Sequence, residues 1–207
     1  MEQQLKGASL ASRAVRRIII ALYRWRGYRL TDKHPVPPRC VIIGVPHTTN
    51  WDFVFFLGAT AEMGISPGFM GKHTLWRWPA GRFMSDMGGV AVDRTAKGRN
   101  YVDQVVDVFA HRSELALVVA PEGTRSASKP WRSGFYHIAR KAGVPLVPAW
   151  VEDATRRGGI GPALMPSGDY AADLEKLLAY YQSVMPGNPR WALLEAAIAE
   201  ERSPDNA

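Results

Sequence analysis

The sequence has a single cysteine, Cys40, among its 207 residues. One cysteine excludes an internal disulfide, and it cannot supply the several thiolates of a zinc finger or an iron–sulfur site. We also find no secretory signal pattern in the sequence. Together these features predict a reducing, cytosolic setting for the protein.

Long hydrophobic runs are also absent. A helix that spans a bilayer needs about 18 to 20 uninterrupted apolar residues, whereas the run Ile18–Tyr23 is far shorter and is bounded by Arg17 and Arg24. Any association with a membrane is therefore expected to be peripheral, on its cytoplasmic inner face.

Acidic residues are scarce near the start of the chain. Glu2 is the one acidic residue in the first thirty positions, against seven basic residues: Lys6, Arg13, Arg16, Arg17, Arg24, Arg26 and Arg29. The whole chain has a formal net charge of +7. This balance favours an anionic partner, which could be phospholipid headgroups, a phosphorylated small molecule or nucleic acid. Nucleic acid ranks last, because the sequence has no recognised binding motif for it.

The same basic region predicts an amphipathic helix from about Ser9 to Arg26. Its apolar residues recur every three or four positions: Leu10, Ala14, Ile18, Ala21, Leu22 and Trp25. The arginines fall outside that face. The face could lie in a membrane interface, where apolar burial and attraction to anionic lipid act together, or it could pack on the protein core. We assign residues 1–30 to this helix and residues 31–207 to one folded domain, and we see no sign of a second domain.

The remainder alternates between predicted strands and helices. Strands are expected at Cys40–Val45, Gly89–Val92 and Leu115–Ala120; helices are expected from about 51 to 64, after Arg94, at 134–142, at 171–182 and from Asn188 onward. The prolines of 144–151 predict an irregular or edge strand, and the stretch 156–168 reads as a loop. The alternation indicates a layered α/β domain, with helices covering a largely parallel or mixed sheet and ligands at strand ends.

His47 and Asp52 are the first candidates for chemistry. They stand five positions apart across a predicted strand-to-helix turn. Such a turn can bring the carboxylate of Asp52 to one imidazole nitrogen, while the other nitrogen accepts a proton. Taken alone, the pair has a structural alternative, in which Asp52 favours the N-terminal dipole of a helix and His47 only packs.

Four segments together resemble the glycerolipid and lysophospholipid acyltransferase family. They are His47 to Asp52, Gly88–Arg94, the segment Pro121-Glu122-Gly123-Thr124-Arg125-Ser126, and Val144–Pro148. The resemblance implies transfer of a fatty acyl group from acyl-coenzyme A or acyl carrier protein to a hydroxyl of a lysophospholipid or related acceptor. It implies that His47 is the general base, oriented by Asp52. The resemblance implies no cofactor and no metal; the acyl thioester is a cosubstrate of the reaction.

The resemblance also suggests how the acceptor is held. Arg94 and Arg125 are the candidates for a phosphate, because guanidinium groups can engage its oxygens in pairs. Lys72 could add a third positive charge or could simply be solvated. Glu122 could fix a hydroxyl or an arginine, and Gly123 and Thr124 complete the substrate-binding loop. The sequence has no Gly-x-Ser-x-Gly elbow, which favours direct transfer without an acyl-enzyme.

The pattern departs from the family at three positions. Pro46 stands where Asn commonly precedes the histidine, and Ala91 and Ala120 stand where Phe is common. These changes leave the acceptor and the acyl length open. Two other functions remain alternatives: hydrolysis of a thioester or lipid, and lipid binding without catalysis.

Overall fold

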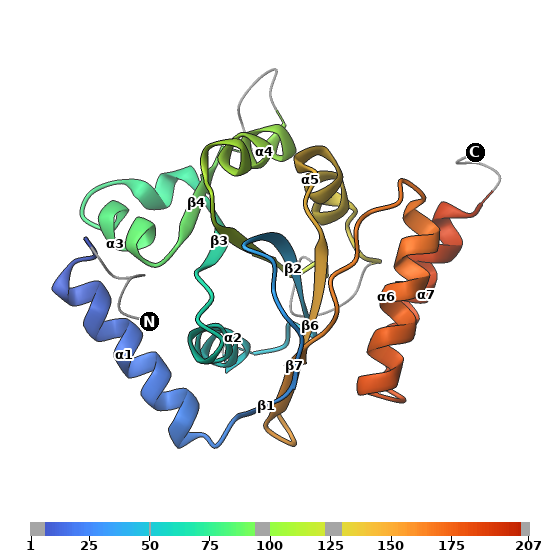
Figure 1. Ribbon diagram of the computed structural model, residues 1–207, viewed down its shortest axis with the longest axis horizontal. Helices are drawn as coiled ribbons and strands as arrows, with labels where there is room; N and C mark the ends of the chain where they lie inside the picture. Colours follow the sequence, from blue (N-terminus) through green and yellow to red (C-terminus); the bar gives the residue numbers. More distant parts are fainter. Residues whose placement is uncertain (1–6, 50, 94–99, 123–129, 204–207) are drawn as a thin grey trace.

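The computed structural model describes residues 7–49, 51–93, 100–122 and 130–203. Its elements, in chain order, are α1 (Leu10–Trp25), β1 (Arg29–Lys33), β2 (Arg39–Val45), α2 (Trp51–Glu62), β3 (Pro67–Lys72), the 3₁₀ turn η2 (His73–Trp76), α3 (Gly81–Asp86), β4 (Gly89–Val92), α4 (Tyr101–His111), β5 (Leu115–Val119), α5 (Gly134–Ala142), β6 (Leu146–Glu152), β7 (Arg157–Ile160), α6 (Tyr170–Val184) and α7 (Trp191–Glu201). The expected α/β class is confirmed (Figure 1).

Within the described residues, seven strands form one sheet in the order β1-β7-β6-β2-β5-β3-β4. Strand β2 lies near the centre and runs parallel to both β5 and β6. Strands β3 and β4 extend the parallel part, whereas β7 is antiparallel to β6. The sheet is therefore mixed and largely parallel, as the sequence predicts, and the carboxyl ends of β2 and β5 lie at one edge.

Alternating residues of β2 supply the two sides of the core. Val41, Ile43 and Val45 belong to a cluster with residues of α4, α5, α6 and α7. Cys40 and Ile42 belong to a second cluster, which includes Phe55 and Ala59 of α2. Figure 1 shows the corresponding layers, with α2 and α1 on one side of the sheet and α6 and α7 on the other. The run of apolar residues in β2 is thus explained by burial on both faces.

Helix α1 forms an outer layer over α2. A side chain at Gly58 of α2 would place its Cβ 2.1 Å from Tyr23 of α1, so glycine is what permits this close contact. Ser9 caps the helix by accepting a hydrogen bond from the backbone N–H of Ser12, as expected for its N-terminus. The division that we place at residue 30 falls inside β1, and it stays a prediction.

The apolar face of α1 points away from the core. Leu10, Ile18 and Trp25 are 80%, 59% and 75% exposed, whereas Ser12 and Arg16 are buried. The alternative that this face packs on the protein core is therefore wrong. No helix in the described part of the chain is both long enough and apolar enough to cross a membrane.

Two predictions about the later strands are also wrong. Strand β6 is not an edge strand but lies between β2 and β7. Pro148 is tolerated there because it faces β7 just beyond the last paired residue of that strand. Its carbonyl accepts a hydrogen bond from the backbone N–H of Gly161 on this side. The missing N–H of Pro148 points to that same side, so pairing with β2 continues.

The other error concerns the glycine-rich stretch 156–168, which we expect to be a loop. Arg157–Ile160 instead forms β7, between β1 and β6. A Cβ at Gly158 would lie 2.2 Å from the ring of Phe55, and one at Gly159 would lie 2.6 Å from both Asp32 and Trp150. These glycines therefore reflect tight packing in a strand rather than a turn.

Candidate active site

His47 and Asp52 lie at the carboxyl end of β2, where the chain turns into α2. The carboxylate oxygen Oδ2 of Asp52 accepts hydrogen bonds from the backbone N–H groups of Thr48, at 2.5 Å, and Thr49, at 2.8 Å. These bonds satisfy donors that the start of a helix leaves free, and they fix the position of the carboxylate. The turn before α2 is thus built around Asp52.

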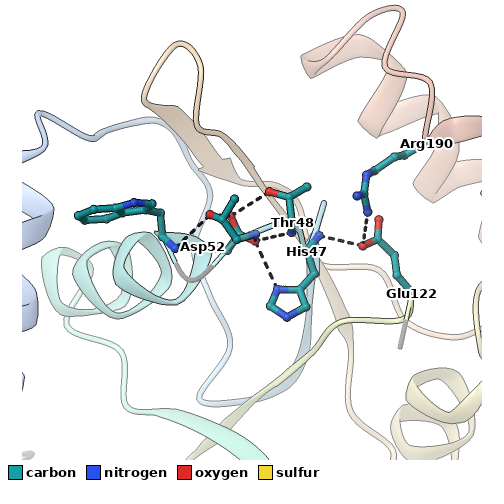
Figure 2. A network of polar contacts seen from close by, with 7 residues as sticks. His47, Thr48, Asp52, Glu122 and Arg190 are labelled. Atoms are coloured by element: carbon teal, nitrogen blue, oxygen red, sulfur yellow. Dashed lines mark hydrogen bonds and ion pairs between the residues drawn. The ribbon is translucent and has the colours of Figure 1, made fainter. Parts of the chain in front are cut away.

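The imidazole of His47 lies beside this carboxylate. Its Nδ1 is 3.4 Å from Oδ2 of Asp52, and the side chains of His47 and Asp52 are 35% and 10% exposed. A carboxylate beside Nδ1 favours a proton on that nitrogen, so that Nε2 of a neutral ring is free to accept a proton. Figure 2 shows the ring of His47 pointing toward Asp52 and away from Glu122. The pair has the arrangement expected of a base and the group that orients it.

Glu122 holds the backbone of His47 from the opposite side. Its Oε2 accepts a hydrogen bond from the backbone N–H of His47 at 2.8 Å. The same oxygen accepts one from Nη1 of Arg190, also at 2.8 Å, and the Glu122 side chain is 1% exposed. A buried carboxylate is stable when it is paired with a cation and hydrogen-bonded, and both conditions are met here. His47 is therefore supported at its ring and at its backbone.

A cavity of about 380 Å³ opens beside His47. Its lining comes from β2, α2, β3, β5 and β6 and is mainly apolar: Gly44, Val45, Pro46, Phe53, Phe55, Phe56, Phe69, Met70, Val118, Val119, Ala120, Ala149, Trp150 and Val151, together with His47 and Asp52. A concave apolar space with a few convergent polar groups is the usual form of a small-molecule site. Within this lining the two candidate catalytic residues supply the ionisable side chains.

Comparison with known proteins adds an independent observation. A family model described as "Acyltransferase" matches residues 28–152, which is more than half of the chain. The chain belongs to the acyltransferase family. The matched part of this acyltransferase-family chain contains β1 to β6 and therefore includes His47, Asp52 and Glu122, but not α6 and α7.

Several curated proteins that are similar to this chain bear the name 1-acyl-sn-glycerol-3-phosphate acyltransferase. The protein of that name from Salmonella typhimurium is 29% identical over 116 residues, which cover 54% of this chain and 46% of the relative. The Escherichia coli protein is 26% identical over 174 residues, or 76% of this chain and 69% of the relative. The Limnanthes alba protein is 28% identical over 101 residues, or 46% and 34%. The chain thus spans about half the length of the Salmonella relative.

The remaining predicted site residues are only partly placed. Arg94, Gly123, Thr124 and Arg125 lie outside the described residues. Lys72 is the exposed last residue of β3, two positions beyond Met70, which lines the cavity. Ala120 lines the cavity and Ala91 is exposed, so only the first of these two small residues shapes the pocket.

Sequence reasoning missed Arg190. This residue precedes α7, and it meets Glu122 across 68 positions of sequence. The helix-start signal at Asn188 and Pro189 indicated that a helix begins here, and α7 does begin at Trp191. Nothing in that signal identifies the carboxylate that Arg190 contacts.

Cys40 is fully buried in β2, and this burial raises the pKa of its thiol to about 12. Because the thiolate rather than the thiol is the nucleophile, Cys40 is unsuited to attack a substrate.

Proposed function

We propose that this protein is an O-acyltransferase that moves a fatty acyl group from an acyl thioester to a hydroxyl of a lysophospholipid or related acceptor. The observation that carries this proposal is His47, oriented by Asp52 in the lining of an apolar cavity. Membership of the acyltransferase family supports it, as do the names of the relatives. The acyl donor is acyl-coenzyme A or acyl carrier protein, and no other cofactor is required.

In the proposed reaction, Nε2 of His47 takes the proton of the acceptor hydroxyl as its oxygen attacks the thioester carbonyl. Asp52, beside Nδ1, stabilises the imidazolium that forms. The carbon–sulfur bond then breaks, and the departing thiolate takes the proton back from His47. The products are an ester and a free thiol, and the histidine returns to its neutral form.

The cavity suits the acyl chain of the donor. Phe55, Phe56 and Met70 line it, and they offer apolar contacts but no charge. Burial of each methylene contributes about 0.8 kcal/mol, which favours an acyl chain in this cavity. Because His47 belongs to the same lining, the carbonyl of a bound acyl chain would lie near its imidazole. The buried thiol of Cys40 is unsuited to form an acyl-enzyme, which favours direct transfer in a ternary complex.

For the acceptor, we propose that Arg94, Arg125 and Lys72 hold a phosphate-bearing headgroup and that Gly123 and Thr124 complete the substrate-binding loop. This part of the proposal rests on the sequence resemblance and on the basic charge of the chain. Guanidinium groups match phosphate oxygens in geometry and in charge. Of the two roles open to Glu122, fixing a hydroxyl or an arginine, its contact with Arg190 favours the second.

We further propose that α1 lies on an anionic membrane surface, at the cytoplasmic inner face. Its outward side combines the exposed apolar residues Leu10, Ile18 and Trp25 with the exposed Arg17 and Arg24. Such a helix gains from apolar burial at the headgroup boundary and from attraction to anionic lipid. A lysolipid acceptor resides in the same interface, so this orientation would bring enzyme and acceptor together.

The test is an assay that follows free thiol and acylated product together, with an acyl thioester and a panel of lysolipids. We expect product only when an acceptor is present. His47→Ala should lower the rate by about 10² to 10⁴-fold, the usual contribution of a general base. His137→Ala, which changes an exposed histidine of α5, is the matched control and should leave the rate unchanged.

Other results would favour the alternatives. Thiol release without acylated product would indicate a hydrolase, in which water replaces the acceptor. Lipid binding that survives His47→Ala, together with no turnover by the wild-type protein across the panel, would indicate a non-catalytic lipid-binding protein.

A further inference from the structure

Arg190 lies outside the segment that matches the family model, yet it contacts Glu122, which supports the backbone of His47. Residues 28–152 match the family, whereas Arg190 belongs to the start of α7. Figure 2 shows its guanidinium group reaching Glu122 from the α7 side, while the backbone N–H of His47 is directed at the same carboxylate oxygen. The C-terminal helix is thereby connected to the backbone of the candidate base.

We propose that Arg190 is a positioning residue, which keeps the Glu122 carboxylate against the backbone N–H of His47 and so fixes where the imidazole stands. This inference rests on the proposed function for its kinetic consequences. The hydrogen-bond arrangement that it describes can be tested without any activity.

The shared oxygen is the first argument. Nη1 of Arg190 and the backbone N of His47 both lie 2.8 Å from the same atom, Oε2 of Glu122. A carboxylate that could rotate freely would not present one oxygen to both donors. The guanidinium group of Arg190 therefore sets the orientation in which the Glu122 carboxylate accepts from the backbone N–H of His47.

Burial is the second argument. The Glu122 side chain is 1% exposed and that of Arg190 is 20% exposed. A buried carboxylate without a cation is strongly disfavoured, so loss of the guanidinium should drive Glu122 toward water, through the space that Arg190 leaves. The backbone of His47 would then lose its acceptor.

The third argument concerns geometry at the base. His47 has two supports, Asp52 at the ring and Glu122 at the backbone. If the backbone support is lost, the ring can pivot about its contact with Asp52, and Nε2 moves. Misplacement of a reacting group by about 1 Å can lower a rate by about 100-fold.

The chain offers a matched control for this ion pair. Arg202 at the other end of α7 pairs with Glu175 of α6, with its Nη2 2.7 Å from Oε1. That pair is exposed, with side chains at 59% and 44%. Arg202→Gln therefore removes an arginine–glutamate contact of α7 without touching His47.

The direct experiment is NMR on protein labelled with ¹⁵N-histidine. The chain contains five histidines, so few backbone amide signals are expected. The His47 amide signal is identified by its absence in His47→Ala. We expect it far downfield in the wild type, because its N–H donates to a carboxylate. It should move upfield in Arg190→Gln and Glu122→Gln, return part of the way in Arg190→Lys, and stay in place in Arg202→Gln.

Kinetics supply a second readout. Arg190→Gln should lower kcat by about 10- to 100-fold with little change in KM for either substrate. Arg190→Lys should recover part of the rate, and thermal unfolding of each variant identifies any that fails to fold. An inactive wild-type protein would contradict the proposed function but not the positioning role of Arg190, because the NMR result tests that role without any activity.

Two results would overturn the inference. One is a His47 amide signal that does not move in folded Arg190→Gln or Arg190→Lys. The other is a raised KM for anionic acceptors with an unchanged kcat, which would mean that Arg190 binds the acceptor directly.

Discussion

Helices α1 and α4 both carry a stripe of apolar residues, but they turn these stripes in opposite directions. In α4, Val102, Val105 and Phe109 are buried in the core. In α1, Ile18 and Trp25 are exposed, while the buried positions include Ser12 and Arg16. Periodicity therefore predicts a helix and identifies its apolar face, but it does not say what that face touches.

The polar side of α1 has its own partners inside the protein. Oδ2 of Asp86 accepts hydrogen bonds from the backbone N–H of Ser9 at 2.9 Å and from the hydroxyl of Ser12 at 2.8 Å. The hydroxyl of Tyr23 donates to Glu62 at 3.0 Å. Polar contacts and the aromatic Tyr23 thus help to attach α1, whereas α4 buries its apolar stripe.

The largest expected effect is a difference in stability between alanine substitutions on the two helices. Phe109→Ala should lower the free energy of unfolding by about 3–5 kcal/mol, because it opens a cavity in the core. Ile18→Ala should change it by no more than about 0.5 kcal/mol, because Ile18 is exposed. Urea unfolding in the absence of lipid measures both. A loss of several kcal/mol from Ile18→Ala would show that its side chain is buried in solution.

The second effect appears when lipid is added. Ile18→Ala and Trp25→Ala should each weaken binding to anionic phospholipid vesicles by about 10-fold, since each removes apolar surface that would enter the interface. Binding should also weaken as salt is raised, because the basic residues contribute through screened attraction. Vesicle sedimentation measures the bound fraction.

Met165→Ala is the control for vesicle binding, because Met165 is also exposed but lies between β7 and α6. This variant should bind as the wild type does. If Met165→Ala weakened binding as much as Ile18→Ala, or if neither α1 variant had any effect, α1 would not be the membrane contact.

The smallest effect concerns the polar side of α1. Ser12→Ala should lower the free energy of unfolding by about 1 kcal/mol at neutral pH, because the hydrogen bond from the buried Ser12 to Asp86 is lost. The pKa of Asp86 is lowered, first by the backbone N–H of Ser9 and then by the hydroxyl of Ser12. A carboxyl with a lowered pKa in the folded state stabilises the fold above its unfolded pKa of about 3.9.

That stabilisation should disappear as the pH falls through the lowered pKa. Asp86→Asn should therefore be less stable than the wild type at pH 7, and the two should converge in strongly acidic solution. Urea unfolding across this pH range measures the difference. A constant difference at every pH would mean that the charge of Asp86 does not hold α1.

Much of the fold was predictable because its elements have strong local signals. The strand Cys40–Val45 and the helix after it were expected from an apolar run that is followed by a turn and capping residues, and β2 and α2 confirm them. Strands β1 and β3 were not expected. The sequence of β1, RLTDK, has one apolar residue, and that of β3, PGFMGK, contains a proline and two glycines. Their pairing with neighbouring strands outweighs these weak local preferences.

The candidate site divides in the same way. The approach of His47 to Asp52 could be expected from sequence because a strand-to-helix turn joins the two residues directly. Of the substrate-binding residues that the family motifs suggest, Glu122 lies against the site, while Arg94, Gly123, Thr124 and Arg125 are outside the described residues. The contact between Glu122 and Arg190 had no local signal, because 68 positions separate the two residues.

By itself, the sequence determined the α/β alternation, the amphipathic helix α1 and the turn that can bring His47 and Asp52 together, because each depends on residues that are close along the chain. The tertiary structure alone decided which way α1 faces, that Gly158 and Gly159 belong to a strand, and that Arg190 reaches Glu122. These features depend on contacts between distant segments. Such contacts arise from the packing of the whole sheet with its helices, which no short pattern of residues specifies.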